Sequence, residues 1–346
     1  MPKPTLLLHD IARLAGVSPS TVSRAINQPE LLAADSLPRI QQVMREQNYS
    51  PAPLSHRRGP KSRKPVTKRV GVWFVGGKSG NPNLNWFRDH LSEIESHESR
   101  ARIDLHMLFS NSAHDLPRAL KTEKFDGLIS QGMEPTPALL RQLKHLPSVW
   151  FMTRRSVNYP GDFVEPNNEE NGAMAADYLA AHGHKVLAVL TTDPGYSANL
   201  RRVSAFMQRA VELGLPAHQI LGQDDPNISY LEIAPLNSEA QSLVQRLNAL
   251  NPRPTGLYIP VDHFAGAFFR TLRQAGLQAP QDFEAILGNY NPIIYHNLEH
   301  HPAVVDINLT TLVRKVIDQV LWRIEHPEAP GRVGILVSPT LRPGQE

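Results

Sequence analysis

The chain has 346 residues, of which 41% are hydrophobic and 20% are charged, with a mean hydropathy of −0.32. This composition predicts a globular protein of two or three domains, because compact domains commonly hold about 100–200 residues. No apolar run is long enough to span a bilayer, and the lack of cysteine excludes disulfides, thiolate zinc sites and cysteine nucleophiles. We therefore expect an intracellular, cytoplasmic protein.

The charge is unevenly distributed along the chain. Residues 1–69 hold twelve lysines and arginines against four acidic residues, a net charge of +8, whereas the whole chain carries +3. The other 277 residues therefore carry a net charge of −5. A basic segment joined to an acidic remainder indicates a nucleic-acid-binding region on a body with a different task. An ordinary solvated surface is the alternative interpretation of the charge.

Residues 9–27, HDIARLAGVSPSTVSRAIN, predict a helix, a tight turn and a second helix. Gly16 follows the first helix, where a left-handed backbone favours glycine. Ser18 is placed to cap the second helix, with Pro19 as its first residue. Three apolar side chains are expected to pack the corner between the helices: Ala15, Val17 and Val22.

A helix-turn-helix docks the start of its second helix in the major groove of DNA. Arg24 is able to make a two-pronged contact with a guanine edge, and Thr21 and Ser23 are able to bind phosphates. A helical hairpin with a surface arginine is the alternative. The candidate DNA-binding residues are Pro19, Ser20, Thr21, Ser23, Arg24, Asn27, Tyr49, Arg57 and Arg58.

A linker follows at residues 51–69, where prolines and cations gather without an acidic residue. Beyond it, apolar runs predict strands at 70–75, 103–109, 127–130, 148–152, 186–190, 256–259 and 285–287. Helical patterns lie near 84–98, 137–145, 168–182, 198–213, 238–249, 262–275 and 308–325. Alternating strands and helices predict an α/β fold with parallel sheets covered on both faces, and the length favours two lobes with a cleft between them.

The segment DIARLAGVSPSTVSRAINQ, followed by a third helix that ends at Asn48-Tyr49-Ser50-Pro51, resembles the DNA-binding head of the lac repressor family of bacterial transcription regulators. The motif is long and specific. One departure is Pro38, which falls inside the third helix of the family. We therefore expect that helix to start later here, capped by Ser36.

The linker is a second departure. Family members form a short hinge helix on DNA and insert a leucine into the minor groove, and Arg58 occupies that position here. Pro53 is able to begin such a helix and Gly59 is able to end it, so the sequence permits a hinge helix without requiring one. An arginine can enter a narrow minor groove without separating base steps, so we expect less DNA bending than a leucine wedge gives. The linker cations are expected to contact phosphates and to make binding steeply salt-dependent.

The resemblance continues through most of residues 70–346. The matching segments are FDGLI at 125–129, NNEENGAMAADYLAAHGHKVLAVL at 167–190, RVSAF at 202–206 and PTGLYIPVDHFAGAFFRTLRQAGLQAPQDFEAILGNYN at 254–291. The body of that family resembles periplasmic sugar-binding proteins, in which two lobes close on a small molecule. The resemblance therefore implies a periplasmic-binding-protein-like body of parallel sheets flanked by helices.

A polyol ligand needs planar charged groups for paired hydrogen bonds and an aromatic face. Arg202 is the best-matched candidate, because this arginine contacts the effector in relatives; a surface arginine is the alternative. Tyr258 falls at a strand end where relatives place a ligand-lining residue, with core packing as the alternative. Asp262 matches the acidic residue of the family, although Val261 replaces the preceding asparagine, and in relatives this acid often caps the following helix.

The segment Gly288-Asn289-Tyr290-Asn291 departs most from the family. Sugar-responsive relatives commonly use an aspartate where this chain has Tyr290, which argues against an ordinary hexose effector. Tyr290 and Asn291 are still able to bind a sugar by stacking and by amide hydrogen bonds. Trp86 and Tyr196 are further candidates, with core packing as the alternative for Trp86.

An enzymatic body has little support in the sequence. The histidines in Glu299-His300-His301 and His182-Gly183-His184 lack the i, i+4 spacing of helical metal ligands. No Gly-x-Ser-x-Gly, phosphate-loop or Gly-x-Gly-x-x-Gly motif is present. We therefore expect no catalytic residue, no metal and no cofactor.

These observations predict a homodimeric transcription regulator on a pseudo-palindromic operator, modulated by a small molecule that is carbohydrate-derived. The alternatives are a non-sugar effector such as a nucleobase, no effector at all, or a ligand-binding or enzymatic body with a vestigial head. The expected domains are the head at 1–50, the linker at 51–69 and the body at 70–346. The first lobe is expected at 70–164 and 292–325, and the second at 165–291 and 326–346. The choice between dimer and tetramer stays open.

Overall fold

The computed structural model describes residues 7–29, 32, 36–47, 49, 67–76, 103–152, 161–222 and 233–344. The chain divides into two compact units, residues 1–64 and 65–346, which are described separately below. The helix expected near 84–98 and the possible hinge helix lie outside the described residues.

The described residues of the head form three α-helices: α1 (Leu8–Leu14), α2 (Pro19–Asn27) and α3 (Ser36–Glu46). The turn between α1 and α2 is the one that the sequence predicts. Gly16 has a φ of +62°, the Ser18 side chain accepts a hydrogen bond from the Thr21 amide at 3.2 Å, and Pro19 is the first residue of α2. A small core fixes the helices together, formed by Ile11, Ala12, Ala15, Val22 and Ile40.

The third helix tolerates its proline. Helix α3 begins at Ser36, so Pro38 is its third residue and lies in the first turn. Amides of the first turn have no partner within the helix, so a proline there removes no helical hydrogen bond. Ser36 is helical in the structure, where the sequence-based expectation made it the cap that precedes the helix.

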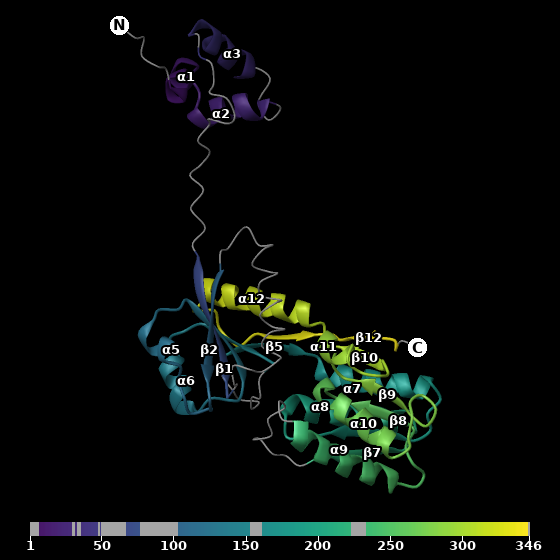
Figure 1. Ribbon diagram of the computed structural model, residues 1–346. Coiled ribbons are helices and arrows are strands. Elements are labelled where there is room, and N and C mark those ends of the chain that lie inside the picture. Colours follow the sequence, from purple (N-terminus) through teal and green to yellow (C-terminus); the bar gives the residue numbers. More distant parts are fainter. Residues whose placement is uncertain are drawn as a thin grey trace. The chain divides into compact units, whose positions relative to one another are not determined.

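The first lobe of the body is built on a six-stranded parallel sheet, in the order β11-β5-β4-β3-β1-β2. Figure 1 shows its neighbouring strands β1 and β2 side by side. Its strands are β1 (Lys68–Val75), β2 (Ile103–Ser110), β3 (Gly127–Gly132), β4 (Ser148–Phe151), β5 (Asp162–Pro166) and β11 (Gly334–Val337). Alternate residues of β1 face opposite layers. Val70, Val72 and Phe74 pack with α12 (Leu309–Glu325), whereas Trp73 and Val75 pack on the side of α5 (Arg118–Thr122) and α6 (Pro137–Leu143).

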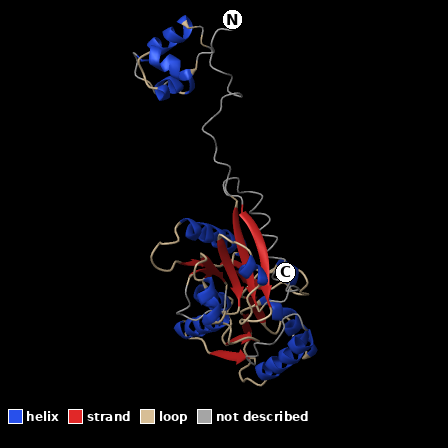
Figure 2. Ribbon diagram, turned by 90° about the vertical axis from the view of Figure 1, so that its left-hand side faces the viewer, coloured by secondary structure: helices blue, strands red, loops and turns tan. Residues whose placement is uncertain are grey.

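The second lobe has its own six-stranded sheet, in the order β12-β10-β9-β8-β6-β7. Its strands are β6 (Leu187–Thr191), β7 (Ala217–Leu221), β8 (Gly256–Ile259), β9 (Glu284–Leu287), β10 (Ala303–Asp306) and the antiparallel β12 (Thr340–Arg342). Helices α7 (Asn168–Ala181) and α8 (Ser197–Glu212) cover one face. Helices α9 (Ile233–Asn248) and α10 (Ala265–Gln274) cover the other. Short turns η3 (Asp262–Phe264) and α11 (Pro292–Tyr295) complete the lobe, and Figure 2 shows strands flanked by helices.

The sheets correct the expected division of the body into lobes. Strand β10 belongs to the second sheet, so residues 292–306 lie in the second lobe and not in the first. Strand β11 belongs to the first sheet, so residues 334–337 lie in the first lobe. Neither strand was expected from the sequence, and the sheet that each one joins is set by pairing, β10 with β9 and β11 with β5.

The chain passes between the lobes three times, and the three crossings lie together. They follow β5, β10 and β11. The Asn167 amide donates to the Val337 carbonyl at 2.8 Å, and the Asn308 side chain donates to the Ser338 carbonyl at 2.8 Å. Asn308 adopts a left-handed backbone with a φ of +57°. The lobes are therefore joined by a narrow set of hydrogen-bonded segments.

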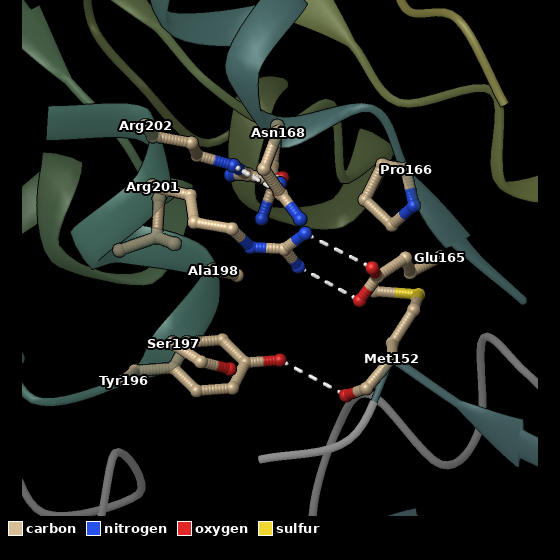
Figure 3. Close-up of a pocket in the computed structure, with 11 residues that line it drawn as sticks. Met152, Glu165, Pro166, Asn168, Tyr196, Ser197, Ala198, Arg201 and Arg202 are labelled. Atoms are coloured by element: carbon tan, nitrogen blue, oxygen red, sulfur yellow. Dashed lines mark hydrogen bonds and ion pairs between the residues drawn. The ribbon is translucent and has the colours of Figure 1, made fainter. Parts of the chain in front are cut away.

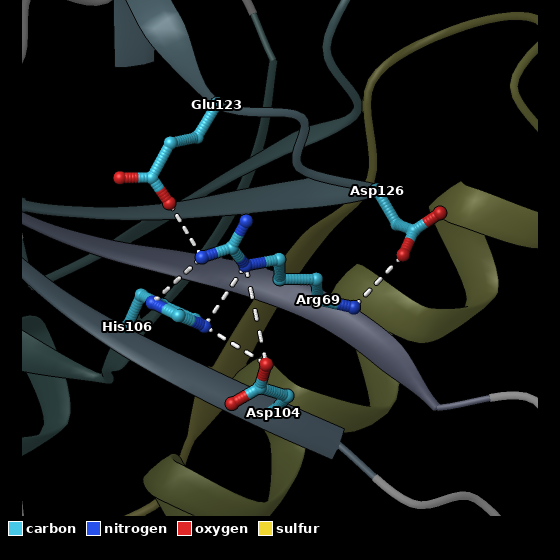
Figure 4. Close-up of polar contacts among 5 residues, drawn as sticks. All are labelled: Arg69, Asp104, His106, Glu123 and Asp126. Atoms are coloured by element: carbon cyan, nitrogen blue, oxygen red, sulfur yellow. Dashed lines mark hydrogen bonds and ion pairs between the residues drawn. The ribbon is translucent and has the colours of Figure 1, made fainter. Parts of the chain in front are cut away.

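The body begins with an anchored arginine, Arg69, the second residue of β1 (Figure 4). Its backbone amide donates to Asp126 at 2.8 Å, and its guanidinium contacts His106 and Glu123. The guanidinium also lies 5.1 Å from the centre of the Phe125 ring. These contacts fix the first strand where it leaves the linker.

No helix in the described part of the chain is long and apolar enough to cross a membrane.

Glu284, at the start of β9, joins the sheet of the second lobe to helix α7. It accepts hydrogen bonds from Tyr178 at 2.6 Å, from His182 at 2.8 Å and from His184 at 3.0 Å. Burial raises the pKa of this carboxyl, but the hydrogen bonds from Tyr178, His184 and His182 outweigh it and hold the pKa below its usual value. The carboxylate form is thus the one that the fold favours.

Replacing Glu284 with glutamine is expected to lower the free energy of unfolding at pH 7 by about 1–2 kcal/mol, because three donors lose a charged acceptor. A lowered folded-state pKa gives stability that is present above the unfolded pKa, about 4.3, and is lost as the pH falls through the folded pKa. Urea unfolding should therefore show the difference between wild type and Glu284→Gln shrinking below about pH 4. Glu299→Gln, at an exposed ion pair with Arg273, should show almost no difference. A constant difference from pH 7 to 3 would contradict the assignment.

Candidate DNA-reading helix and ligand cleft

The exposed start of α2 carries the residues predicted to read DNA. Pro19, Ser20 and Arg24 are exposed, whereas Thr21 and Ser23 are half-buried. The Ser18 hydroxyl lies 2.7 Å from the Ser20 hydroxyl and 2.8 Å from that of Thr21, so these groups shape the start of the helix. This leaves Arg24 as the long cationic side chain on the exposed face of α2.

Of the remaining predicted DNA-binding residues, only Tyr49 has a side chain within the described structure. Tyr49 is half-buried and packs against the core of the head, where its amide donates to the Met44 carbonyl at 2.8 Å. Asn27 is the last residue of α2, but its side chain is outside the described part of the structure. Arg57 and Arg58 also lie outside the described residues.

A cavity lies between the two lobes of the body (Figure 3). Met152, Glu165 and Pro166 of the first lobe line one side. The second lobe contributes Asn168, Tyr196, Ser197, Ala198, Arg201, Arg202, Val261 and Asn289. The cavity volume is about 30 Å³, enough for about two water molecules. A ligand of the size of a sugar therefore enters only if the lobes separate or the lining side chains move.

Arg202, the strongest effector candidate from the sequence, lines this cavity and is 2% exposed. Its Nε donates to Asn168 at 2.8 Å, and its Nη1 lies within hydrogen-bond distance of Asn289 and of the carbonyls of Pro260 and Gly288. These four acceptors are uncharged. Burial lowers the pKa of Arg202, because a cation in a water-poor site lacks full solvation. The surface-arginine alternative is therefore wrong.

Tyr258 is a core residue, which corrects the expectation that it lines the ligand site. It is fully buried in β8, stacks on Phe206 at 5.1 Å between ring centres, and donates to Asn171 at 2.5 Å. The Asn171 amide in turn donates to the Gly288 carbonyl at 2.9 Å. Tyr258 thus acts behind the site, by holding the backbone that accepts a hydrogen bond from Arg202.

Asp262 lies near Arg202 but caps no helix. Neither η3 nor α10 has a side-chain hydrogen bond at its N-cap. The carboxyl is 8% exposed, and its Oδ2 atom has no hydrogen-bond partner among the described residues. Burial raises its pKa to about 6. The helix-cap interpretation of this residue is therefore wrong.

Tyr290 and Asn291 do not line the cavity as expected. The Tyr290 ring lies under the Arg342 guanidinium, 4.3 Å from ring centre to cation, and contacts Tyr295 edge-on. Asn291 is buried and caps α11 by accepting from the Ile293 amide at 3.0 Å. Both side chains therefore have structural partners, and it is Asn289 of the same segment that contacts Arg202. Trp86 lies outside the described residues.

Two interactions cross the cavity from one lobe to the other (Figure 3). Arg201 pairs with Glu165 through both terminal nitrogens, at 3.0 and 2.7 Å. The Tyr196 hydroxyl donates to the Met152 carbonyl at 2.9 Å. Tyr196 was expected near the ligand and does line the cavity. Four further cavity residues were not expected from the sequence: Glu165, Asn168, Arg201 and Asn289. Arg201 carried no sequence signal beyond its place beside Arg202.

Gly172 of α7 sets the position of Arg202 by letting α7 pack closely against the backbone of α8. A Cβ atom at residue 172 would lie 2.1 Å from the Arg202 carbonyl oxygen, so α7 approaches the backbone of α8 only because this residue has no side chain. Gly172→Ala is expected to separate the two helices and to lower the free energy of unfolding by about 1–2 kcal/mol. Urea unfolding measures the change.

Gly266→Ala is the matched control for that measurement. Its added Cβ would find no atom closer than 3.6 Å, and alanine is the better helix former, so the control should be neutral or slightly stabilising. Equal effects of the two substitutions would show that α8 does not depend on Gly172.

Comparison with known proteins supports both units. Residues 7–52 match the family model described as bacterial regulatory proteins, lacI family. Residues 176–345 match the model of a periplasmic binding protein-like domain. The head therefore matches the lacI family model, and most of the body matches a periplasmic binding protein-like domain. The model matched by the head describes regulatory proteins and the curated relatives are transcriptional repressors, so the chain is a DNA-binding transcription regulator.

Curated relatives and solved structures resemble the chain over most of its length. The HTH-type transcriptional repressor PurR of Pasteurella multocida is 24% identical over 289 residues, 81% of this chain and 80% of the relative. PurR of Vibrio vulnificus is 26% identical over 286 residues, with the same coverage. A complex of the regulator CelR with cellobiose has a TM-score of 0.61 at 17% identity, covering 98% of this chain and 99% of that one. The lac repressor dimer bound to operator and the anti-inducer ONPF has a TM-score of 0.60 at 17% identity, with coverage of 99% and 98%. These likenesses confirm the fold.

Among the described residues, no three histidine, aspartate or glutamate side chains are arranged to hold a metal ion. The histidines of the second lobe that sequence inspection singled out, His182 and His184, bind Glu284 instead. Their role in the described structure is to hold α7 against the sheet.

Proposed function

We propose that this chain is a regulator of the lacI family that acts as a homodimer on a pseudo-palindromic operator, and that a small molecule between its lobes changes its DNA affinity. The observation that carries the DNA-binding part is the capped start of α2, with Arg24 exposed on it. Two heads related by a two-fold axis read two half-sites of a symmetric operator. The solved lac repressor that resembles this chain is a dimer bound to operator, which supports the same assembly here.

The ligand-binding part rests on the cavity between the lobes. Arg202 and Asn289 present polar groups there, and the CelR structure that resembles this chain is a cellobiose complex. We infer a carbohydrate-derived effector. A nucleobase-like effector is the second candidate, because Tyr290 stands where sugar-responsive relatives carry an aspartate, and its ring has partners elsewhere. In either case the effect on DNA binding is a coupling free energy, typically about 1–3 kcal/mol.

The experiment that tests the DNA-binding part is selection from random duplex DNA with the full-length protein at about 0.15 M salt, where non-specific binding is weak enough to compete away. Sequencing the retained DNA should reveal an enriched pseudo-palindrome. Its half-site spacing reports the dimer geometry, and its central step tests the arginine proposed for the minor groove. Retention without any shared sequence would contradict a sequence-specific regulator.

The effector class is tested by thermal unfolding with neutral sugars and with purine bases. A ligand at one hundred times its Kd adds about 2.7 kcal/mol to the stability of the protein that binds it. The compound that stabilises the chain should then change the affinity for the selected operator. A stabilising compound that leaves operator affinity unchanged would separate ligand binding from regulation.

A further inference from the structure

The cavity between the lobes is rich in hydrogen-bond donors. Arg201 and Arg202 both reach it from α8, and Asn168 lies beside them (Figure 3). The Asn168 side chain is 1% exposed, its Oδ1 accepts from Arg202, and its Nδ2 has no partner among the described residues. A buried amide nitrogen without an acceptor is costly, so this atom indicates that an acceptor is missing from the cavity.

The first turn of α8 adds further donors. The first hydrogen bond within this helix joins the Leu200 amide to the Tyr196 carbonyl, and Tyr196 provides no side-chain cap. Ser197 and Ala198, whose amides precede that bond, line the cavity. The start of a sixteen-residue helix carries a partial positive charge that favours an anion. Two arginines, an unpartnered amide and a helix start therefore converge on one small space.

A carboxylate of the protein itself occupies part of this space. Glu165 is 4% exposed and meets Arg201 in a two-pronged pair, the geometry by which an arginine holds a carboxylate or a phosphate group. Glu169 lies 3.7 Å from the same guanidinium and is largely exposed. Arg202, in contrast, has only uncharged hydrogen-bond partners in the described structure. One of the two cations is thus paired across the lobes, and the other lacks a directly bonded anion.

We propose that the effector is an anionic small molecule whose carboxylate or phosphate group takes the place of Glu165 on Arg201, with Arg202 and Asn168 binding beside it. This inference rests on the proposed ligand-binding function of the cleft and specifies its chemical class. Because Glu165 belongs to β5 of the first lobe and Arg201 to α8 of the second, the exchange releases a contact that holds the lobes together. Binding at this point therefore changes the relation between the lobes directly.

The test uses inorganic phosphate as the probe and the full-length protein. Thermal unfolding is measured in potassium phosphate and in potassium chloride of equal ionic strength. Glu165→Gln removes the competing carboxylate, and we expect phosphate to bind about tenfold more tightly to this variant than to wild type. The double variant Glu165→Gln with Arg201→Met removes both charges of the pair together, so neither member is left without its counter-ion, and it should lose this gain. Arg209→Gln, an exposed arginine on the same helix outside the cavity, is the control and should match wild type.

Organic probes then distinguish the source of the anion. Glucose 6-phosphate and gluconate are compared with glucose at equal concentration, so the arms separate a phosphate ester from a carboxylate. Stabilisation by either anionic compound beyond that by glucose, lost in the double variant, supports the proposal. A phosphate effect that is no larger in Glu165→Gln, or that persists in the double variant, overturns it. If glucose binds at least as tightly as both anions, the anionic-effector proposal is overturned, but the regulator proposal is unaffected. If operator selection fails, the regulator proposal is overturned, but the phosphate result still stands.

Discussion

Replacing Asp162 with asparagine is expected to lower the free energy of unfolding of the body by about 3–5 kcal/mol, because it leaves a buried arginine without its counter-ion. Asp162 is 2% exposed and accepts two hydrogen bonds from Arg323, at 2.8 and 2.7 Å. It also accepts from Gln319 at 2.6 Å and from the Val333 amide at 2.9 Å. Burial raises the pKa of this carboxyl, but the bonds from Arg323 and its neighbours outweigh burial and lower it.

The site joins three parts of the chain that are distant in sequence. Asp162 begins β5, Arg323 lies near the end of α12, and Arg323 also donates to the Ala329 carbonyl at 2.8 Å in the segment that leads to β11. Urea unfolding followed by circular dichroism gives the change in stability. Asp318→Asn removes an exposed ion pair with Lys315 from the same helix and should cost less than about 1 kcal/mol. Similar losses for the two variants would show that burial of the Asp162 pair contributes little.

Arg24→Ala is expected to weaken binding to the selected operator by about 1–3 kcal/mol, roughly 5- to 150-fold, because a two-pronged arginine contact to guanine is lost. The side chain is exposed on α2 and is not part of the core of the head, so the fold should be unchanged. Fluorescence anisotropy with the selected operator and with a scrambled duplex measures affinity and specificity. The specificity should relax at one base-pair position in each half-site.

Arg45→Ala is the control for this prediction. Arg45 is also exposed in the head but lies on α3, so its loss removes the same charge without touching α2. We expect a smaller loss that is similar for both duplexes, as for a contact with phosphate alone. An equal loss on operator and scrambled DNA for Arg24→Ala would show that Arg24 binds phosphate and reads no base.

The head was predictable almost completely from the sequence because its geometry is local. Gly16, Ser18 and Pro19 each satisfy a backbone requirement within a few residues of themselves, so a short segment specifies the turn and the helix start. Most strands of the body were also predictable, since buried parallel strands appear as apolar runs. The strands β5, β7, β10, β11 and β12 were not expected, and the sheet that β11 joins is set by pairing with β5, about 170 residues earlier in the chain.

Of the residues that line the cavity, the sequence predicted only Arg202 and Tyr196. Glu165 and Asn168 become cavity residues only because β5 ends and α7 begins at the edge between the lobes. Tyr258 is a residue type that often lines ligand sites, but its ring lies on the packed face of its strand. No sequence pattern distinguishes the two faces of a strand that is buried on both sides. The contact of Tyr290 with Arg342 depends on the antiparallel pairing of β12, which lies about fifty residues farther along the chain. Asn291, in contrast, caps α11 within its own segment.

The three crossings between the lobes also affect the order in which the lobes can fold during synthesis of the chain. The ribosome releases the strands β1 to β5 before the second lobe, yet the apolar face of that first sheet is covered by α12, which comes only after β10. A nascent chain that ends before Leu309 therefore leaves Val72, Phe74 and Ile129 without their packing against α12, while the second lobe already has most of its strands. We expect the second lobe to fold first during synthesis, and the earlier-made first lobe to require protection from aggregation until its last helix emerges.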